Sequence, residues 1–198
     1  MSILLKQFSG RSISEIVPSL SNLRITVFRE FPYLYEGSLD YEQNYLKTYV
    51  DSEKSLVIAV YDGDKLIGAS TCLPLNDECD EFRKPFQDDG YDIEKIFYFG
   101  ESIILPEYRG NKLGHEFFRL REEHAKKVNP DLQMTTFCAV ERANDHPLRP
   151  VDYQTLDKFW LRQGYLKTIN LMTEFSWKDL DKENEDAKPM RFWVKRWT

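Results

Sequence analysis

The sequence of 198 residues is poor in the residues that build disulfide frameworks and metal sites. Its three cysteines are odd in number and none of them forms a C-x-x-C pair: Cys72, Cys79 and Cys138. Its three histidines form no H-x-x-x-H pair. Neither a disulfide scaffold nor a metal site is therefore predicted, and a reducing cytoplasm is the expected location.

Long apolar runs and an excess of positive charge are also absent. No segment approaches the ~18 apolar residues of a membrane span. The first residues, Met1 to Lys6, lack the basic region and small-residue cleavage site of a signal peptide. With 27 Lys and Arg against 33 Asp and Glu, the net charge is −6. This balance argues against nucleic acid and membrane partners, and it permits a cationic small substrate.

What the sequence does have is enough apolar surface for one core. Apolar residues make up 41% and aromatic residues 14% of the chain, so global disorder is not expected. The length fits a single domain over residues 1–198.

Hydrophobic periodicity and turn residues predict strands alternating with helices. Strands are expected over residues 3–8, 55–61, 66–75, 96–105, 132–140, 165–177 and 190–197. Helices are expected after Ser12 or Ser14, with a start or a kink at Pro18, after Ser38, over 112–128, and from Asp152 or Thr155 to Gln163. Residues 76–96 form an inserted helix or loop, and 178–188 a solvated charged loop. The predicted fold class is α/β, a mixed sheet with helices on both faces.

The segment 103–114 carries the clearest chemical signal. A buried strand ends at Pro106, a turn follows at Gly110, and a helix begins near Lys112. Backbone N–H groups and the helix dipole would make this turn an anion site, with Arg109 and Lys112 adding charge. An ordinary connection in an α/β protein has the same pattern. The Walker A and Rossmann glycine motifs are both absent.

Residues 106–114, Pro-Glu-Tyr-Arg-Gly-Asn-Lys-Leu-Gly, resemble the phosphate-binding motif of the GNAT (Gcn5-related N-acetyltransferase) superfamily, [Q/R]-x-x-G-x-[G/A]. The middle glycine is replaced by Lys112, which we expect to adopt the helical conformation of a helix start. The resemblance covers about residues 54–166. It includes the hairpin over 55–75 and the closing pattern L-D-K-F-W-L-R-Q-G-Y-L over 156–166.

The resemblance implies a twisted mixed sheet and an acyl donor, most often acetyl-CoA, with no metal. It implies direct attack by a primary amine of a small molecule or peptide, through a tetrahedral intermediate. The pantetheine arm would lie between the strand ending at residues 103–105 and the strand ending at residues 138–140. The expected coenzyme A contacts are Ile103, Ile104, Leu105, Arg109, Gly110, Asn111, Lys112, Leu113, Gly114 and Trp160.

Several residues are candidates for moving the proton that an alkylammonium must lose before it attacks. Glu101, on the strand before the turn, is the first candidate base; it also fits a surface carboxylate. Glu141 with His146 is the second, and the histidine also fits a structural role. Many relatives place a tyrosine acid where this chain has Trp160, whose indole is no acid. Tyr153 or Tyr108 is the candidate substitute.

An aromatic loop is the candidate acceptor site. Phe31, Tyr33 and Tyr35, with residues 76–96 and 141–152, could hold a cation by ring faces and carboxylates. The same aromatics also fit a role in the core. Cys138 fits a packed thiol better than a nucleophile.

Two further questions stay open at this point. The alternative function is a non-catalytic acyl-CoA-binding module for regulation or interaction, favoured by Trp160 and Lys112 at motif positions. A homodimer could form through aromatic side chains of the last strand: Phe192, Trp193 and Trp197. The sequence does not distinguish acetyl from longer acyl donors.

Overall fold

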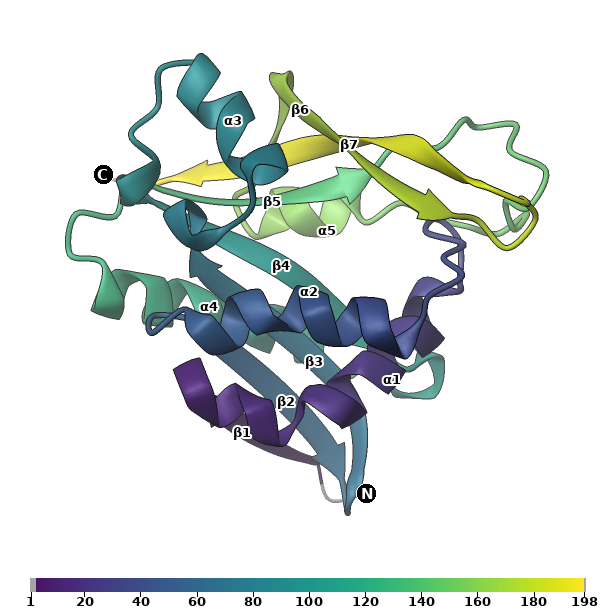
Figure 1. Cartoon of the computed structure of the whole chain (residues 1–198), viewed down its shortest axis with the longest axis horizontal. Coiled ribbons are helices and arrows are strands. Elements are labelled where there is room, and N and C mark those ends of the chain that lie inside the picture. Colours follow the sequence, from purple (N-terminus) through teal and green to yellow (C-terminus); the bar gives the residue numbers. More distant parts are fainter. Residues whose placement is uncertain (1–2, 198) are drawn as a thin grey trace.

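The computed structural model describes residues 3–197 and shows one seven-stranded sheet (Figure 1). The strand order is β1-β2-β3-β4-β5-β7-β6. Only the β4–β5 pair is parallel, and the other five neighbouring pairs are antiparallel. The strands are β1 (Ile3–Phe8), β2 (Leu56–Asp62), β3 (Lys65–Pro74), β4 (Ile96–Ile104), β5 (Met134–Val140), β6 (Leu166–Lys178) and β7 (Glu185–Arg196).

Helices lie on both faces of this sheet, which confirms the predicted α/β class. They are α1 (Val17–Phe28), α2 (Leu39–Asp51), α3 (Asp80–Asp88), α4 (Leu113–Val128) and α5 (Asp157–Arg162). In Figure 1, α1 and α2 lie in front of β2 to β4, and α4 lies behind them. α3 packs beside β6.

The helix starts follow from local chemistry. Pro18 stands in the first turn of α1, where its missing N–H costs nothing, so the helix starts there and no kink is needed. A short 3₁₀ turn, Gly10–Glu15, occupies the preceding segment. At α2 the side chain of Ser38 accepts a hydrogen bond from the Tyr41 N–H at 3.3 Å, as the sequence predicted.

The charged loop predicted over residues 178–188 is too long. It covers only residues 179–184, because β6 runs to Lys178 and β7 starts at Glu185. Lys188 is buried, and its ammonium donates to the backbone oxygen of Trp177 at 2.8 Å. A buried lysine is possible there because its donors are satisfied.

Two of the aromatic residues of the last strand that were expected to dock a second subunit, Phe192 and Trp193, are not on the surface. β7 lies between β5 and β6, and the side chains of its middle part are buried in the core. Phe192 and Trp193 are 0% and 2% exposed. Phe192 and Trp193 could reach a second subunit only if the core opened, so these two rings are not a docking surface. The homodimer itself stays a prediction.

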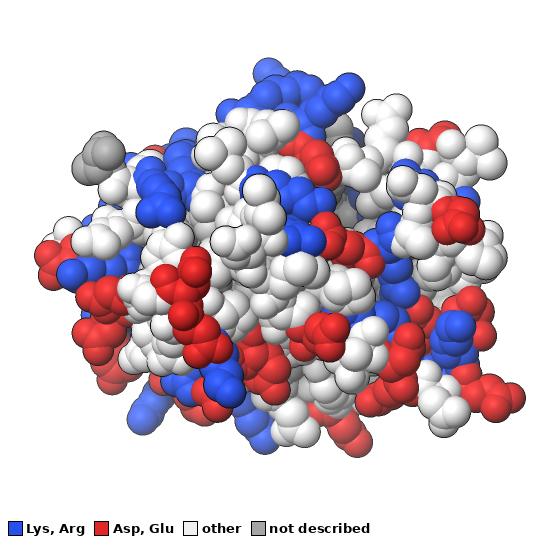
Figure 2. Space-filling view, turned by 90° about the horizontal axis from the view of Figure 1, so that it is seen from above, with Lys and Arg blue, Asp and Glu red and all other residues white. Residues whose placement is uncertain are grey.

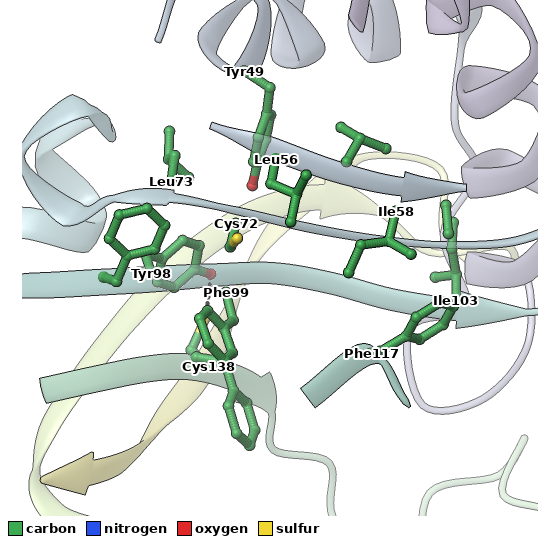
Figure 3. Close-up of a cluster of buried hydrophobic side chains, with 14 of the residues drawn as sticks. Tyr49, Leu56, Ile58, Cys72, Leu73, Tyr98, Phe99, Ile103, Phe117 and Cys138 are labelled. Atoms are coloured by element: carbon green, nitrogen blue, oxygen red, sulfur yellow. Dashed lines mark hydrogen bonds between the residues drawn. The ribbon is translucent and has the colours of Figure 1, made fainter. Parts of the chain in front are cut away.

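The core lies on both sides of the central strands. Figure 3 shows Tyr49 reaching from α2 toward the sheet, and Phe117 lying beside Ile103 farther along the strands. The hydroxyl of Tyr98 lies 3.3 Å from the Cys138 sulfur. This contact joins β4 to β5 just beyond the region where the two strands pair.

The surface carries charges of both signs. On the face seen in Figure 2, basic and acidic side chains are interspersed among uncharged ones. Over residues 3–197, no helix has both the length and the apolar character that crossing a membrane requires.

Candidate functional site

The site lies where β4 and β5 separate. The two parallel strands pair over only three residue pairs, from Ile96–Met134 to Tyr98–Thr136. Beyond this point β4 stays paired with β3 up to Ile104, and β5 stays paired with β7. A cavity of about 400 Å³ fills the gap, and we call it the splay cavity. The V-shaped gap that the sequence resemblance implied is therefore present.

A β-bulge shapes the floor of the splay cavity. Ser70 pairs with Ser102 while Cys72 pairs with Phe99, so β4 carries one residue more than β3 across this stretch. The extra residue falls at Gly100–Glu101. Such bulges bend a strand and redirect its side chains, and here the redirected side chain is a carboxylate.

The backbone of the bulge is held by side chains. The Glu101 carbonyl accepts hydrogen bonds from the Ser70 hydroxyl at 2.8 Å and from the Arg121 guanidinium at 3.3 Å. Its N–H donates to Thr71 Oγ1 at 3.2 Å. Arg121 is fully buried, and its charge lies 4.3 Å from the centre of the Phe99 ring. These contacts fix the position of Glu101.

The turn after β4 presents a row of unpaired donors. Over the described part of the chain, no hydrogen bond to another protein group is found for the five backbone N–H groups from Gly110 to Gly114. They precede or open α4, whose dipole adds positive potential at its N-terminus. Such an arrangement suits a diphosphate.

Lys112 departs from the helical conformation expected for it. Its φ is +61°, in the left-handed region that favours glycine, and Gly110 has φ +84°. The prediction for Lys112 was wrong because the chain needs two left-handed residues to turn sharply from β4 into α4. The position therefore has the glycine-type backbone of the motif although it carries a lysine side chain.

A groove of about 920 Å³ runs along this turn, and we call it the turn groove. Of the ten residues predicted to contact coenzyme A, nine line it. Leu105 does not, since it is buried and its N–H donates to the Ile67 oxygen on β3. A side chain at Gly114 would place a Cβ 3.1 Å from the Phe159 ring, so glycine lets α4 and α5 approach closely.

Arg109 is partly engaged by the protein itself. Its guanidinium lies 2.8 Å from the carboxylate of Glu30, and its Nε donates to the Ile104 oxygen at 3.1 Å. The side chain is 46% exposed. The ion pair places the guanidinium over the end of β4, at the edge of the turn groove.

The carboxylate of Glu101 is buried and has an ion-pair partner at only one of its two oxygens. It is 6% exposed, and its Oε2 lies 2.6 Å from Arg24 Nη1. The other oxygen, Oε1, is buried and has no hydrogen-bond partner among the described residues. Arg24 also pairs with Glu42. One guanidinium thus faces two carboxylates, which leaves this group of three with a net negative charge.

Glu141 also lines the splay cavity, but both of its oxygens are occupied. Lys167 and Arg191 lie 2.8 and 3.0 Å from them. Partial burial alone would raise the pKa of Glu141, but the hydrogen bonds from Arg191 and Lys167 outweigh it and lower that pKa. A carboxylate held in this way accepts a proton poorly.

His146 and Tyr153 both pack against Phe31. The Phe31 ring contacts the His146 ring at 5.8 Å and the Tyr153 ring at 4.6 Å between centroids. Tyr153 lines both the splay cavity and the turn groove, and His146 lines neither. Burial raises the pKa of Tyr153, so its hydroxyl stays protonated at neutral pH.

Trp160 is packed as a wall of the cavity. Its ring lies 5.0 Å from both the Phe137 and the Trp193 rings. It lines the splay cavity and the turn groove. The other candidate acid, Tyr108, donates its hydroxyl hydrogen to Asp62 at 3.1 Å, so that hydroxyl is engaged with β2.

A smaller cavity of about 110 Å³ adjoins the splay cavity, and we call it the aromatic pocket. It shares Gly100, Glu101 and Cys138 with the splay cavity. Of the predicted acceptor-loop residues, Tyr33 and Tyr35 line it, whereas Phe31 lines the splay cavity and the turn groove. Cys138 borders both cavities with a thiol whose pKa burial raises to about 12.

The sequence interpretation missed Arg24 and Glu78. Glu78 follows β3, and its Oε1 accepts a weak hydrogen bond, at 3.4 Å, from the hydroxyl of Tyr49. Burial raises the pKa of Glu78 to about 7, and the nearby Glu101 adds to the effect. No short-range pattern marks these residues, because 53 positions separate Arg24 from Glu78 in the chain.

Comparison with known proteins rests on three-dimensional structure. No protein-family model matches the sequence, and no curated protein does. Among solved structures, NAA60 of Arabidopsis thaliana in complex with a bisubstrate analogue matches over 100% of both chains, with TM-score 0.62 and 11% identity. The chain has the fold of the GNAT acetyltransferases.

Other structures with the GNAT fold show the same extent of similarity. A probable acetyltransferase from Staphylococcus epidermidis matches over 100% of both chains, with TM-score 0.61 and 10% identity. A ribosomal-protein-alanine N-acetyltransferase from Brucella melitensis matches over 98% of this chain and 99% of its own, with TM-score 0.61 and 10% identity. The resemblance inferred from residues 106–114 is thereby confirmed for the fold.

Proposed function

We propose that this protein is an N-acyltransferase that moves an acetyl group from acetyl-CoA to a primary amine of a small molecule or peptide. The observation that carries the proposal is the connection between the turn groove and the splay cavity. Phe31, Ser102, Tyr153 and Trp160 line both. A diphosphate on the turn amides would therefore send its attached chain toward the β4 edge and Glu101.

The residues fit a coenzyme A thioester in three respects. The five N–H groups from Gly110 to Gly114 match the anionic diphosphate. The apolar walls at Ile103 and Trp160 suit the pantetheine arm. The β5-facing side of β4 beyond Tyr98 has no neighbouring strand, so it offers backbone groups to that arm.

Glu101 is the residue we propose as proton acceptor. An alkylammonium near its Oε1 gives up a proton, and the nitrogen then attacks the thioester carbonyl through a tetrahedral intermediate. The C–N bond forms, the C–S bond breaks, the nitrogen loses its second proton to give the neutral amide, and coenzyme A leaves as a thiolate that takes up a proton. Tyr153 borders the splay cavity and can donate that proton. Glu141 and His146 are the alternative bases.

The test begins with acetyl-CoA binding by calorimetry and thiol release with a panel of amines. The diagnostic pair is Gly110→Val and Gly90→Val. Both glycines have left-handed backbones, φ +84° and +79°, and at both an added Cβ would meet nothing within 4 Å. Their stability losses should be similar, but Gly110→Val should weaken acetyl-CoA binding at least about tenfold and Gly90→Val should not. Equal binding by both variants would overturn the site.

A second candidate function is a non-catalytic acyl-CoA-binding module. Trp160, in the position of the usual tyrosine acid, favours it, and so does the ion pair between Glu101 and Arg24. For this candidate, acetyl-CoA raises the melting temperature while no amine is modified. Turnover with any amine that is lost in Glu101→Gln, with acetyl-CoA affinity retained, would exclude it.

A further inference from the structure

The walls of the aromatic pocket are unusually rich in rings. The lining combines nine aromatic side chains with Met190 and Cys138: Phe28, Tyr33, Tyr35, Tyr41, Tyr45, Phe82, Tyr98, Phe175 and Trp177. They come from α1, α2, α3, β4 and β6 and from the loop after α1. Phe82 packs against both Tyr98 and Phe175 with 4.5 Å between centroids. Such a surface binds apolar groups, and the faces of its rings attract cations.

The pocket is small, which limits the group it can hold. Its volume is about 110 Å³. An apolar cavity of ~150 Å³ in another protein holds one benzene molecule. The aromatic pocket therefore has room for a group no larger than a single six-membered ring or a short branched alkyl chain.

The charged residues at the inner end of the pocket favour an acceptor that carries one positive charge and no carboxylate. Arg24 is the only Lys or Arg in its lining, and it already faces Glu42 and Glu101. An acceptor carboxylate would meet two carboxylates and no unpaired cation, so it would be disfavoured. An ammonium group would find Glu101 Oε1, which is buried and without a partner.

The pocket opens toward solvent on the side of α2. Tyr41 is 50% exposed, and its ring packs edge-on against Tyr35 at 6.2 Å. The aromatic pocket shares only Phe28 and Tyr33 with the turn groove. An amine can therefore enter past Tyr41 while the acyl donor occupies the turn groove.

We infer that the acceptor is a primary monoamine whose single compact apolar group, of the size of one phenyl ring, occupies the aromatic pocket. This inference rests on the proposed function and adds the substrate class. The ammonium nitrogen lies at Glu101, where the aromatic pocket meets the splay cavity. Amino acids are poor acceptors because the pocket lining has no unpaired cation for their carboxylate. Polyamines are poor acceptors because the aromatic lining offers no further carboxylate for a second ammonium group.

The experiment compares amines that differ in the size, polarity and charge of the group that carries the primary amine. Thiol release from acetyl-CoA is measured with benzylamine, phenethylamine, ethanolamine, glycine, spermidine and 1-naphthylmethylamine. The two phenyl amines should give kcat/KM values at least about tenfold above those of ethanolamine and glycine. The reason is that moving their rings from water into the aromatic pocket is favourable. The naphthyl amine should be poor because its double ring exceeds the pocket.

A matched pair of variants locates the effect. Phe175→Ala enlarges the aromatic pocket, and Phe8→Ala makes the same change in β1, outside all three cavities. Both phenylalanines are half-buried in strands. Phe175→Ala should raise the ratio of naphthylmethylamine to benzylamine turnover about tenfold, and Phe8→Ala should leave it unchanged.

The outcomes separate the two proposals. Equal turnover of phenyl and polar amines, or an unchanged ratio in Phe175→Ala, overturns the substrate class and leaves acetyl transfer standing. If no amine is acetylated and acetyl-CoA does not bind, the proposed function fails. In that case calorimetry with benzylamine tests whether the aromatic pocket binds an amine. Binding to the wild type that is weaker in Glu101→Gln supports the pocket as an amine site, and no binding to the wild type overturns it.

Discussion

Arg24 Nη1 lies 2.6 Å from Glu101 Oε2, so a buried cation holds one oxygen of the carboxylate at the junction of the splay cavity and the aromatic pocket. Burial alone would lower the pKa of Arg24, but Glu101, Tyr45 and Glu42 outweigh it and keep the guanidinium charged. The ion pair orients Glu101 and leaves Oε1 for a ligand.

Replacing the proposed proton acceptor should separate binding from turnover. Glu101→Gln keeps the shape of the side chain and removes its basicity, so amine acetylation should fall by about 10²- to 10⁴-fold. Acetyl-CoA affinity, measured by calorimetry, should not change. Glu107→Gln, on the exposed turn, is the control and should retain full activity. Full activity in Glu101→Gln would instead direct attention to Glu141 or His146.

Removing the buried cation should destabilise the fold. Arg24→Met leaves Glu42 and Glu101 buried without compensation, and the free energy of unfolding should fall by about 3–5 kcal/mol. The control is Arg119→Met, which breaks the ion pairs with Glu116 and Glu123 of an arginine that is 50% exposed and should cost at most about 1 kcal/mol. Urea denaturation measures both. Equal losses in the two variants would contradict the importance of the buried group.

The left-handed backbone at Lys112 predicts the response to glycine. A non-glycine residue in this conformation costs about 1–2 kcal/mol, and glycine costs about 0.5–1 kcal/mol in unfolded-chain entropy. Lys112→Gly should therefore leave stability unchanged or raise it by up to about 1.5 kcal/mol. Lys127→Gly, within α4, should lower it by about 0.5–1 kcal/mol. A loss at Lys112 as large as that at Lys127 would contradict the assigned backbone.

Glu78 should make stability depend on pH. Its pKa in the folded protein is about 7, raised from 4.5 by burial. Between these values the folded state holds a proton that the unfolded state has lost, so stability falls as pH rises. Glu78→Gln removes this dependence. The free energy of unfolding of the variant, relative to that of the wild type, should increase by up to about 3 kcal/mol between pH 4.5 and pH 7.

The measurement for Glu78 is urea denaturation at several pH values. Glu94→Gln, an exposed exchange of the same type, should keep a nearly constant difference from wild type, within about 0.5 kcal/mol. A gain for Glu78→Gln that is equally large at pH 4.5 and at pH 8 would show that charge at this position is not the cause.

Local pattern determined much of the fold. The hairpin of β2 and β3 follows from dense apolar runs around Asp62-Gly63-Asp64, and its turn has Gly63 at φ +60° as such turns require. Helix α4 follows from its spacing of apolar residues. The strand–turn–helix sequence at 103–114 also identified the turn groove, because all of its parts are neighbours along the chain.

Longer-range features escaped the sequence. Nothing near Lys178 to Lys188 indicates that Lys188 is buried, because burial depends on β6, whose Trp177 oxygen accepts one of its hydrogen bonds. The left-handed Lys112 was missed because the residue type alone favours a helical conformation.

The sequence by itself determined the acidic charge, the order of strands and helices, and the strand–turn–helix segment proposed to bind a diphosphate. The charge is a sum over residues, and the other two depend on residues close together in the chain. Only the tertiary structure decided which groups meet at Glu101. Arg24, Glu42 and the rings of the aromatic pocket come from five helices and strands and from the loop after α1, and they converge there beside the opening between β4 and β5. Such convergence is set by packing, and no local periodicity encodes it.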